Sequence, residues 1–307
     1  MATYDATWRP PEPPSSGSSV SALLVARVYR ILLEDTSMVG VIAVGALVSS
    51  LAFAGIAVPA WLLGGADLFS NPFSVRTILL YLVAGWAAAF VSVLFSGAVV
   101  AAGIARLDGH PITVTAALGV AMRRWRQLAA WALVSTVVGF LAEQLNRFGI
   151  LGNVLRVLAD LAWALATLLV LPIIIVEGRM PTAAITESTS MVKHQLMLTV
   201  RTKVRFYLPL VVVMLLAALL TGAGLLVFIQ YHHETPEWGI GGLLLAVVGF
   251  VLFVGAACVE SAADALLNLV LYRHALGLPV PGVDARDLPR LPGTGEPSPP
   301  GWTTGMP

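Results

Sequence analysis

Six long apolar runs divide this sequence of 307 residues, and they constrain its fold more than any other feature. They cover residues 38–63, 77–105, 127–145, 154–176, 206–229 and 239–271. A helix rises about 1.5 Å per residue, so about 20 residues cross a hydrocarbon core of about 30 Å. The third run is the weakest, since its fully apolar part is residues 128–142, and it could be re-entrant instead of crossing. The runs predict an all-α, polytopic bundle of six transmembrane helices.

Composition supports lipid as the solvent of this chain. Residues are 58% hydrophobic and 11% charged, whereas soluble domains carry about 25% charged residues. The net charge of +1, with basic residues spread between helix ends, gives no indication of nucleic-acid binding. The single cysteine, Cys258, lies inside an apolar run, which excludes an intramolecular disulfide and favours a packing role.

The two ends of the chain differ from the membrane domain, which we place at residues 20–282. Residues 1–19 are rich in Pro and Ser, residues 283–307 are rich in Pro, and both segments are predicted to be disordered. In residues 20–33, Val28 and Leu32 share a helical face while Arg27 and Arg30 point elsewhere, as in an interfacial amphipathic helix. Because the first run begins only near Met38, we expect it to stay as a span and not to be cleaved as a signal peptide.

Basic residues predict the orientation of the chain. With a cytosolic N-terminus, fifteen of the 18 Lys and Arg residues fall on the inner side, which is the positive-inside pattern of a cell-membrane protein with both termini cytosolic. Only Arg76, Arg147 and Arg156 fall outside. Aromatic residues at the predicted span ends, such as Trp61 and Trp238 outside and Trp125 and Tyr272 inside, agree with this orientation.

A weak repeat follows the second and fourth runs. Asp108-Gly109-His110-Pro111 follows the second, and Glu177-Gly178-Arg179-Met180-Pro181 follows the fourth. In each, an acid-Gly pair predicts the end of a span, and the proline predicts the start of an amphipathic interfacial helix on the cytosolic side. Two further prolines predict local geometry, because Pro172 should kink the fourth helix and Pro209 should lie in the first turn of the fifth.

Several short motifs carry a family resemblance. They are Arg106-Leu107-Asp108-Gly109, Arg123-Arg124-Trp125, Val176-Glu177-Gly178 and Leu271-Tyr272-Arg273-His274-Ala275. Over about residues 23–282 the chain resembles an uncharacterised family of prokaryotic six-helix membrane proteins, known only as a domain of unknown function. It also has a looser likeness to the membrane domain of some glycerophosphodiester phosphodiesterases, but it has no phosphodiesterase catalytic domain. The resemblance implies architecture and supplies no catalytic residues.

The strongest candidate for a functional site is an acidic stripe on the sixth run. Glu260, Asp264 and Asn268 follow i, i+4, i+8 spacing and therefore share one helical face. One interpretation pairs these acids with Arg123, Arg124, Arg201 or Arg205 near the cytosolic boundary. The other is a proton or cation site that faces the bundle interior.

Other charged residues are predicted to be structural or to contact lipid. Arg156 with Asp160, and Glu143 with Arg147, have the spacing of helical ion pairs. The loop His232-His233-Glu234 with Glu237 lacks the scaffold of a metal site, so no metal is predicted. The residues expected at lipid head groups are Arg123, Arg124, Trp125, Arg126, Arg201, Lys203 and Arg205.

The sequence leaves two functions open. No motif of a protease, hydrolase or phosphate-binding loop is present, so we expect no enzyme activity and no cofactor. The first hypothesis is a non-catalytic accessory or scaffold protein that contacts membrane lipids, protein partners or a second copy of itself. The second is a transporter or channel for a small solute, ion or lipid that uses the acidic stripe.

Overall fold

The computed structural model describes residues 25–26, 28–30, 32, 36–64, 74–145, 149–194, 196–231, 236–276 and 278. Within these residues the chain is helical and has no strand. The helices are α2 (Ser37–Gly64), α4 (Val75–Leu107), α5 (Val114–Arg123), α6 (Trp125–Leu145), α7 (Gly149–Thr167), α8 (Val170–Glu177), α9 (Pro181–His194), α10 (Leu196–Tyr231) and α11 (Pro236–Ala275). The predicted tails, residues 1–19 and 283–307, lie outside the described residues.

Six helical segments in the described chain are long and apolar enough to cross a membrane, which confirms the six predicted runs. They are α2, α4, α6, α10, α11 and one segment that consists of α7 and α8. The third, α6, is an unbroken helix of 21 residues. Its length is about 32 Å, which is sufficient for a full crossing.

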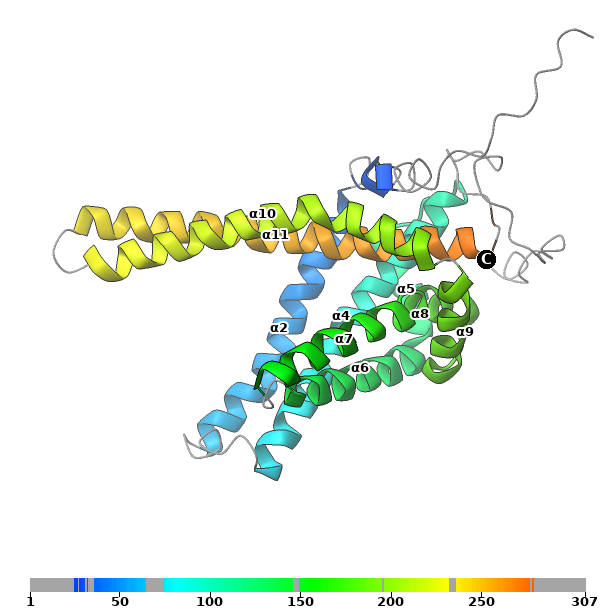
Figure 1. Cartoon of the computed structure of the whole chain (residues 1–307), viewed down its shortest axis with the longest axis horizontal. Helices are drawn as coiled ribbons and strands as arrows, with labels where there is room; N and C mark the ends of the chain where they lie inside the picture. Colours follow the sequence, from blue (N-terminus) through cyan, green and yellow to red (C-terminus); the bar gives the residue numbers. More distant parts are fainter. Residues whose placement is uncertain are drawn as a thin grey trace, which may run out of the picture.

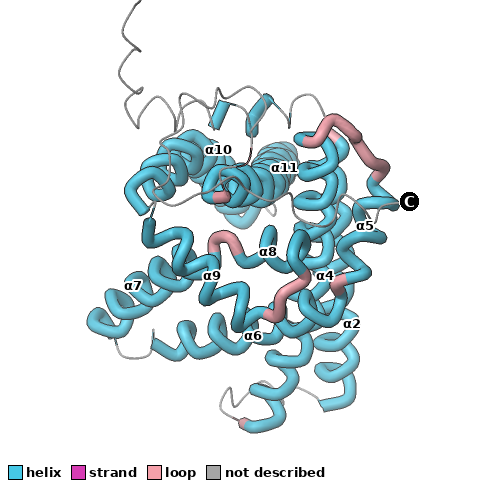
Figure 2. The backbone as a smooth tube through the Cα atoms, turned by 90° about the vertical axis from the view of Figure 1, so that its right-hand side faces the viewer, coloured by secondary structure: helices cyan, strands magenta, loops and turns pink. Residues whose placement is uncertain are grey.

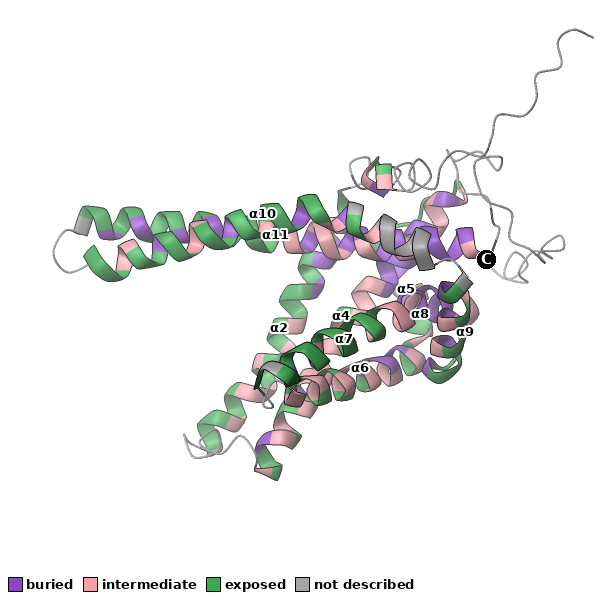
Figure 3. Ribbon diagram, viewed as in Figure 1, coloured by how far each residue is buried: buried purple, intermediate pink, exposed green. Residues whose placement is uncertain are grey.

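The helices form two diverging arms that meet at one end of the molecule (Figure 1). The α10–α11 hairpin is one arm, and α2 with α4 forms the other, while α6 packs beside α4 and α7 packs against α6 and α9. The short helices α5, α8 and α9 gather at the end where the chain leaves α11, as the second view also shows (Figure 2). Buried residues concentrate at this same end, which we call the core end (Figure 3).

Small residues on α4 allow the close packing of the core end. The segment from Gly97 to Ala101 is buried throughout and lies near α8, where Ile173 and Ile174 are fully buried. A Cβ atom on Gly103 would meet the side chains of Leu266 and Leu269 of α11 at 2.6 and 2.9 Å. Small residues in membrane helices permit such approach, and here they bring α11 against α4.

The fourth membrane segment is broken between α7 and α8. Pro172 has no N–H to donate to the carbonyl of residue 168, and its ring clashes with that carbonyl in a regular helix. The break falls at Leu168 and Leu169, so the predicted kink is confirmed. The N–H of Leu169 donates instead to the Ser188 hydroxyl of α9 at 3.1 Å, which satisfies a backbone group freed by the break.

Two predictions made from prolines were wrong. Pro209 lies in the interior of α10, because that helix begins at Leu196, well before the apolar run. Hydropathy marks the part of a helix that lipid covers, and not the point where its hydrogen bonds begin. Pro111 does not open α5, which starts at Val114 and is capped by the Thr113 side chain. Pro181 does open α9, as expected.

Glycines bring the backbones of α10 and α11 into contact along the hairpin. A Cβ atom on Gly242 would lie 2.6 Å from the backbone nitrogen of Phe228, and one on Gly249 would lie 2.5 Å from that of Thr221. On α10, Leu210, Ala217 and Gly224 are buried at seven-residue intervals. This is the heptad spacing of supercoiled helix pairs. The two helices of this arm are therefore tightly paired.

Candidate functional site

Asp264 of α11 is the centre of a polar cluster with α10. Its Oδ1 atom accepts a hydrogen bond from the Tyr207 hydroxyl at 2.5 Å and an ion-pair contact from Lys203 Nζ at 2.6 Å. Its Oδ2 atom accepts from Asn268 Nδ2 at 2.9 Å. The Lys203 ammonium also lies 5.4 Å from the centroid of the Tyr207 ring, within the range of a cation–π contact. Both carboxylate oxygens of Asp264 are therefore occupied by neighbouring side chains.

The acidic stripe is thus split by its contacts. Asp264 and Asn268 are brought together, whereas Glu260 is half-buried and makes none of these bonds. The partner of Asp264 is Lys203, and not Arg123 or Arg124 as one interpretation predicted. Lys203 therefore forms an ion pair with α11, although the sequence predicted that it would contact lipid head groups. The side chains of Arg201 and Arg205 lie outside the described residues.

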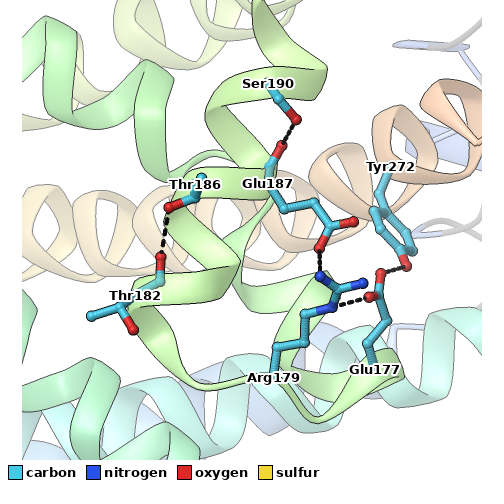
Figure 4. Close-up of polar contacts among 7 residues, drawn as sticks. All are labelled: Glu177, Arg179, Thr182, Thr186, Glu187, Ser190 and Tyr272. Carbon is cyan, nitrogen blue, oxygen red and sulfur yellow. Dashed lines mark hydrogen bonds and ion pairs between the residues drawn. The ribbon is translucent and has the colours of Figure 1, made fainter.

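A second cluster joins α8, α9 and α11 at the core end (Figure 4). The Tyr272 hydroxyl donates to Glu177 Oε1 at 2.6 Å. Arg179 bridges two carboxylates, with Nε 2.6 Å from Glu177 Oε2 and Nη1 2.8 Å from Glu187 Oε2. Burial raises the pKa of the Glu187 carboxyl, the nearby Glu177 carboxylate raises it further, and Arg179 opposes both. This cluster fixes the segment that follows the broken fourth span.

A third contact links α11 to the end of α4. Arg273, 8% exposed, places Nη1 2.7 Å from Oδ1 of Asp108, the residue that ends α4. Asp108 and Glu177 are the acids of the two repeated acid-Gly pairs. Each of them binds a residue of α11, and the two residues, Tyr272 and Arg273, are adjacent in the chain. The weak repeat in the sequence therefore marks two equivalent attachment points for α11.

The basic residues at the corner between α5 and α6 have a different environment. Arg124 is the C-cap of α5, and its guanidinium lies against Gly178, which adopts a φ of +69°. Arg123, Trp125 and Arg126 are exposed. Within the described part of the chain, none of the three arginines of this corner takes part in an ion pair. The corner therefore presents cationic groups beside an exposed indole, a combination suited to anionic lipid head groups.

Arg156 of α7 organises a more exposed ion-pair group. Its Nη1 atom lies 2.8 Å from Glu143 Oε2, and its Nε atom lies 3.4 Å from Asp160 Oδ2. The predicted Arg156–Asp160 pair is present, and Glu143 shares the same arginine. Arg147, which the sequence assigned to Glu143, lies outside the described residues. The group joins α6 to α7.

No group of three or more His, Cys, Asp or Glu side chains that could hold a metal ion occurs among the described residues. His232, His233 and Glu234 fall outside that set, and Glu237 is exposed at the start of α11. The prediction that this loop binds no metal therefore stays a prediction.

Sequence reasoning missed most of the partners in these clusters. Tyr207, Glu187 and the Asp108–Arg273 pair were not singled out, because the partners are separated by up to 165 residues along the chain. One signal was available, since the acid-Gly pairs and the closing Leu271-Tyr272-Arg273-His274-Ala275 motif were both noted in the sequence. The structure shows that these motifs bind one another.

The described part of this molecule has six helical segments that are long and apolar enough to cross a membrane, and it has no strand. Its polar clusters connect these helices to one another. The molecule is therefore a polytopic membrane protein of the α-helical class. Residues 73–278 match a family of unknown function (DUF6159), and the chain belongs to this family. No curated protein and no solved structure matches the chain. No finding bears on the looser likeness to the phosphodiesterase membrane domain, which stays a prediction.

Proposed function

We propose that this protein is a non-catalytic membrane scaffold that holds lipid and partner surfaces in a fixed arrangement. The observation that carries the proposal is the coordination of Asp264. A transport carboxylate must release its protein partners in order to bind and release an ion, whereas Asp264 accepts from Lys203, Tyr207 and Asn268 together. Such contacts favour a group that holds α10 against α11.

The basic corner supplies the proposed lipid contact. Arg123 and Arg126 are exposed, and Trp125 is 51% exposed between them. Juxtamembrane arginines gain about 1 kcal/mol each at an anionic surface. The excess of basic residues at the core end supports a cell-membrane orientation in which this end and both termini face the cytosol.

Ion flux tests the central claim. The purified protein is reconstituted into liposomes that contain a pH-sensitive or cation-sensitive dye, and a gradient is imposed across the membrane. We expect flux equal to that of empty liposomes for the wild type and for Glu260→Gln/Asp264→Asn. Flux that exceeds the empty control and is lost in the double variant would contradict the scaffold proposal and support the transporter alternative.

Lipid retention tests the basic corner separately. Native mass spectrometry of protein purified with phosphatidylglycerol should show fewer bound lipids for Arg123→Gln/Arg126→Gln than for the wild type. Arg76→Gln is the matched control, because Arg76 is an exposed arginine at the opposite end of the membrane-spanning region, in the first turn of α4. Equal retention in all three proteins would refute the head-group role.

A further inference from the structure

A cavity of about 190 Å³ lies where the two arms diverge, between α2, α4 and α11. Its polar lining consists of Ser92 and Ser96 of α4, Ser261 of α11 and the thiol of Cys258. Its apolar lining includes Phe95 of α4 and Phe253 of α11. None of Glu260, Asp264 and Asn268 lines it, so this cavity is separate from the acidic cluster.

The three serine hydroxyls of the cavity differ from other hydroxyls in these helices. Ser50, Thr136 and Thr167 each donate to the carbonyl four residues earlier, at 2.9, 2.8 and 2.7 Å. That local bond is the usual way to satisfy a hydroxyl in a membrane helix. Ser92, Ser96 and Ser261 make no hydrogen bond to any residue that the structure describes. Three donors on two helices are therefore directed to one space without a partner.

The wall formed by α2 is held close to α4. A Cβ atom on Gly45 would lie 2.6 Å from the Cβ and Cγ atoms of Phe95, so only glycine permits this approach. Ile42 is buried on the core side of the cavity, and Ala46 lines it one turn further along α2. These two residues lie about 8 and 14 Å from the start of α2 at about 1.5 Å per residue, which places this wall of the cavity in the half of α2 nearer the core end.

The polarity of the cavity changes along its length. Ser96 and Ser261 lie toward the core end of their helices, whereas Phe253 and Val254 lie toward the tip of the α10–α11 hairpin. Phe253, Val254 and Ser92 are exposed, so the cavity opens at its rim. The neighbouring outward faces are apolar, with Val44 53% and Leu47 63% exposed. Lipid chains are the material that covers such faces in a bilayer.

We propose that this cavity binds the carbonyl end of one acyl chain of a membrane lipid, with the ester or carboxyl oxygen at the serine hydroxyls and the adjoining methylene groups along Phe253 and Val254. A dry apolar cavity of about 150 Å³ is known to bind a molecule of the size of benzene. A cavity of about 190 Å³ therefore accepts a short segment of chain, and not a whole lipid. The proposal rests on the membrane location of the chain, and it is independent of whether the protein conducts ions.

The native thiol provides the test, because Cys258 is the only cysteine and lines the cavity. The rate of alkylation by N-ethylmaleimide is measured on full-length protein in a steroid-based detergent, which carries no acyl chain. Dioleoyl phosphatidylglycerol is then titrated in. We expect saturable protection, reaching about tenfold at ten times the half-saturating lipid concentration, where about a tenth of the sites remain free.

The control thiol is Leu244→Cys in a Cys258→Ser background. Leu244 lies on α11, is 61% exposed and does not line the cavity. Its alkylation should fall only in proportion to the lipid added, without saturation. A Cys258 rate that is unaffected by lipid, or that follows the same non-saturating course as the control thiol, would overturn the proposal.

A comparison of several ligands tests the acyl chain and its carbonyl end separately. Phosphatidylglycerol, phosphatidylcholine and free oleate should all protect Cys258, since they share an acyl chain with a carbonyl oxygen. Dodecane should protect less, and Ser96→Ala/Ser261→Ala should remove the difference between dodecane and oleate. Protection by phosphatidylglycerol alone would show head-group recognition and overturn the chain proposal.

A filling variant gives a second readout that does not depend on the thiol. Ala46→Phe extends into the cavity, whereas Ala43→Phe adds the same side chain to an exposed position that does not line it. Native mass spectrometry should show that one tightly held lipid is lost from Ala46→Phe and kept by Ala43→Phe. The same lipid count in both variants, with melting temperatures that show both are folded, would contradict the assignment.

Discussion

The two halves of α11 have similar apolar sequences and opposite surroundings. In the half nearer the core end, residues 258–275, Leu266, Leu267, Leu269, Val270 and Leu271 are at most 3% exposed. In the half nearer the hairpin tip, residues 237–256, the large side chains face outward, and the buried positions are Gly239, Gly242, Ala246 and Gly249. We call these the buried half and the exposed half.

The comparison shows that hydropathy alone does not reveal what an apolar side chain contacts. In the exposed half, the large residues face outward, where lipid is expected, and the small residues meet α10. In the buried half, the large residues meet protein, and the polar residues Asp264, Tyr272 and Arg273 bind α10, α8 and α4 respectively. The exposed half depends on close backbone approach, and the buried half depends on side-chain packing and polar contacts.

Leucine truncation should separate the two halves most strongly. Leu267→Ala removes a side chain with 0% exposure and should cost about 2–5 kcal/mol of unfolding free energy, because the protein cannot refill the space. Leu244→Ala removes one that is 61% exposed and should cost little, because lipid chains replace it. The measurement is a denaturation series in micelles. Equal losses of unfolding free energy in the two variants would contradict the proposed difference between the two halves.

A glycine substitution should instead be costly in the exposed half of α11. Gly242→Leu places a side chain against the backbone of Phe228 and Gly224, which cannot move aside, and should cost about 3 kcal/mol or more. The neighbouring Gly241→Leu meets nothing within 4 Å and should leave stability nearly unchanged. Thermal melting of the two variants checks this prediction. A similar loss in both would show that helix propensity, and not contact with α10, determines the effect.

Loss of the Asp264 carboxylate should have an intermediate effect. Asp264→Asn removes the direct ion-pair partner of Lys203 in a partly buried site and should cost about 1–3 kcal/mol. Asp160→Asn is the matched control in a more exposed pair, where the side chains of Arg156 and Asp160 are 34% and 53% exposed, and it should cost less than about 1 kcal/mol. Chemical denaturation at constant pH measures both. A larger loss from Asp160→Asn would contradict the structural role of the Asp264 cluster.

The smallest expected effect is a pH dependence from Glu187. Because its folded-state pKa is raised, chiefly by burial, the protonated form is favoured in the fold. Its contribution to stability should be present below the ordinary carboxyl pKa of about 4.3, and it should be lost as pH rises through the folded-state value. Melting temperatures from pH 4 to 7 should therefore fall less steeply in Glu187→Gln than in the wild type. Arg179→Gln removes the opposing charge and should move the transition to higher pH, and an unchanged transition would contradict the role of Glu187.

Local sequence features predicted the spans well, and long-range contacts limited the rest. Run length identified all six spans, including α6, because membrane thickness imposes a minimum on each. The effect of Pro172 was predictable because one missing N–H acts on one turn of helix. The start of α10 at Leu196 was not, since charged residues continue the helix outside the apolar run.

The candidate site was predicted only in part. The i, i+4 spacing of Asp264 and Asn268 on one helix was sufficient to predict that they share a face, and they are in contact. The choice of Lys203 over the arginines depends on how α10 packs against α11, 61 residues away in the chain. A single sequence does not encode that register in any local pattern.

The helices of this molecule differ greatly in length, which has a consequence for the bilayer around it. The helix α6 has 21 residues and α11 has 40, which correspond to about 32 and 60 Å. A hydrocarbon core of about 30 Å matches the first, and the second must tilt strongly or project beyond it. The lipid around the protein therefore borders helices of unequal length, and the membrane is expected to thicken beside the α10–α11 hairpin and to keep its ordinary thickness beside α6. A protein of this shape should be sensitive to membrane thickness as well as to lipid charge.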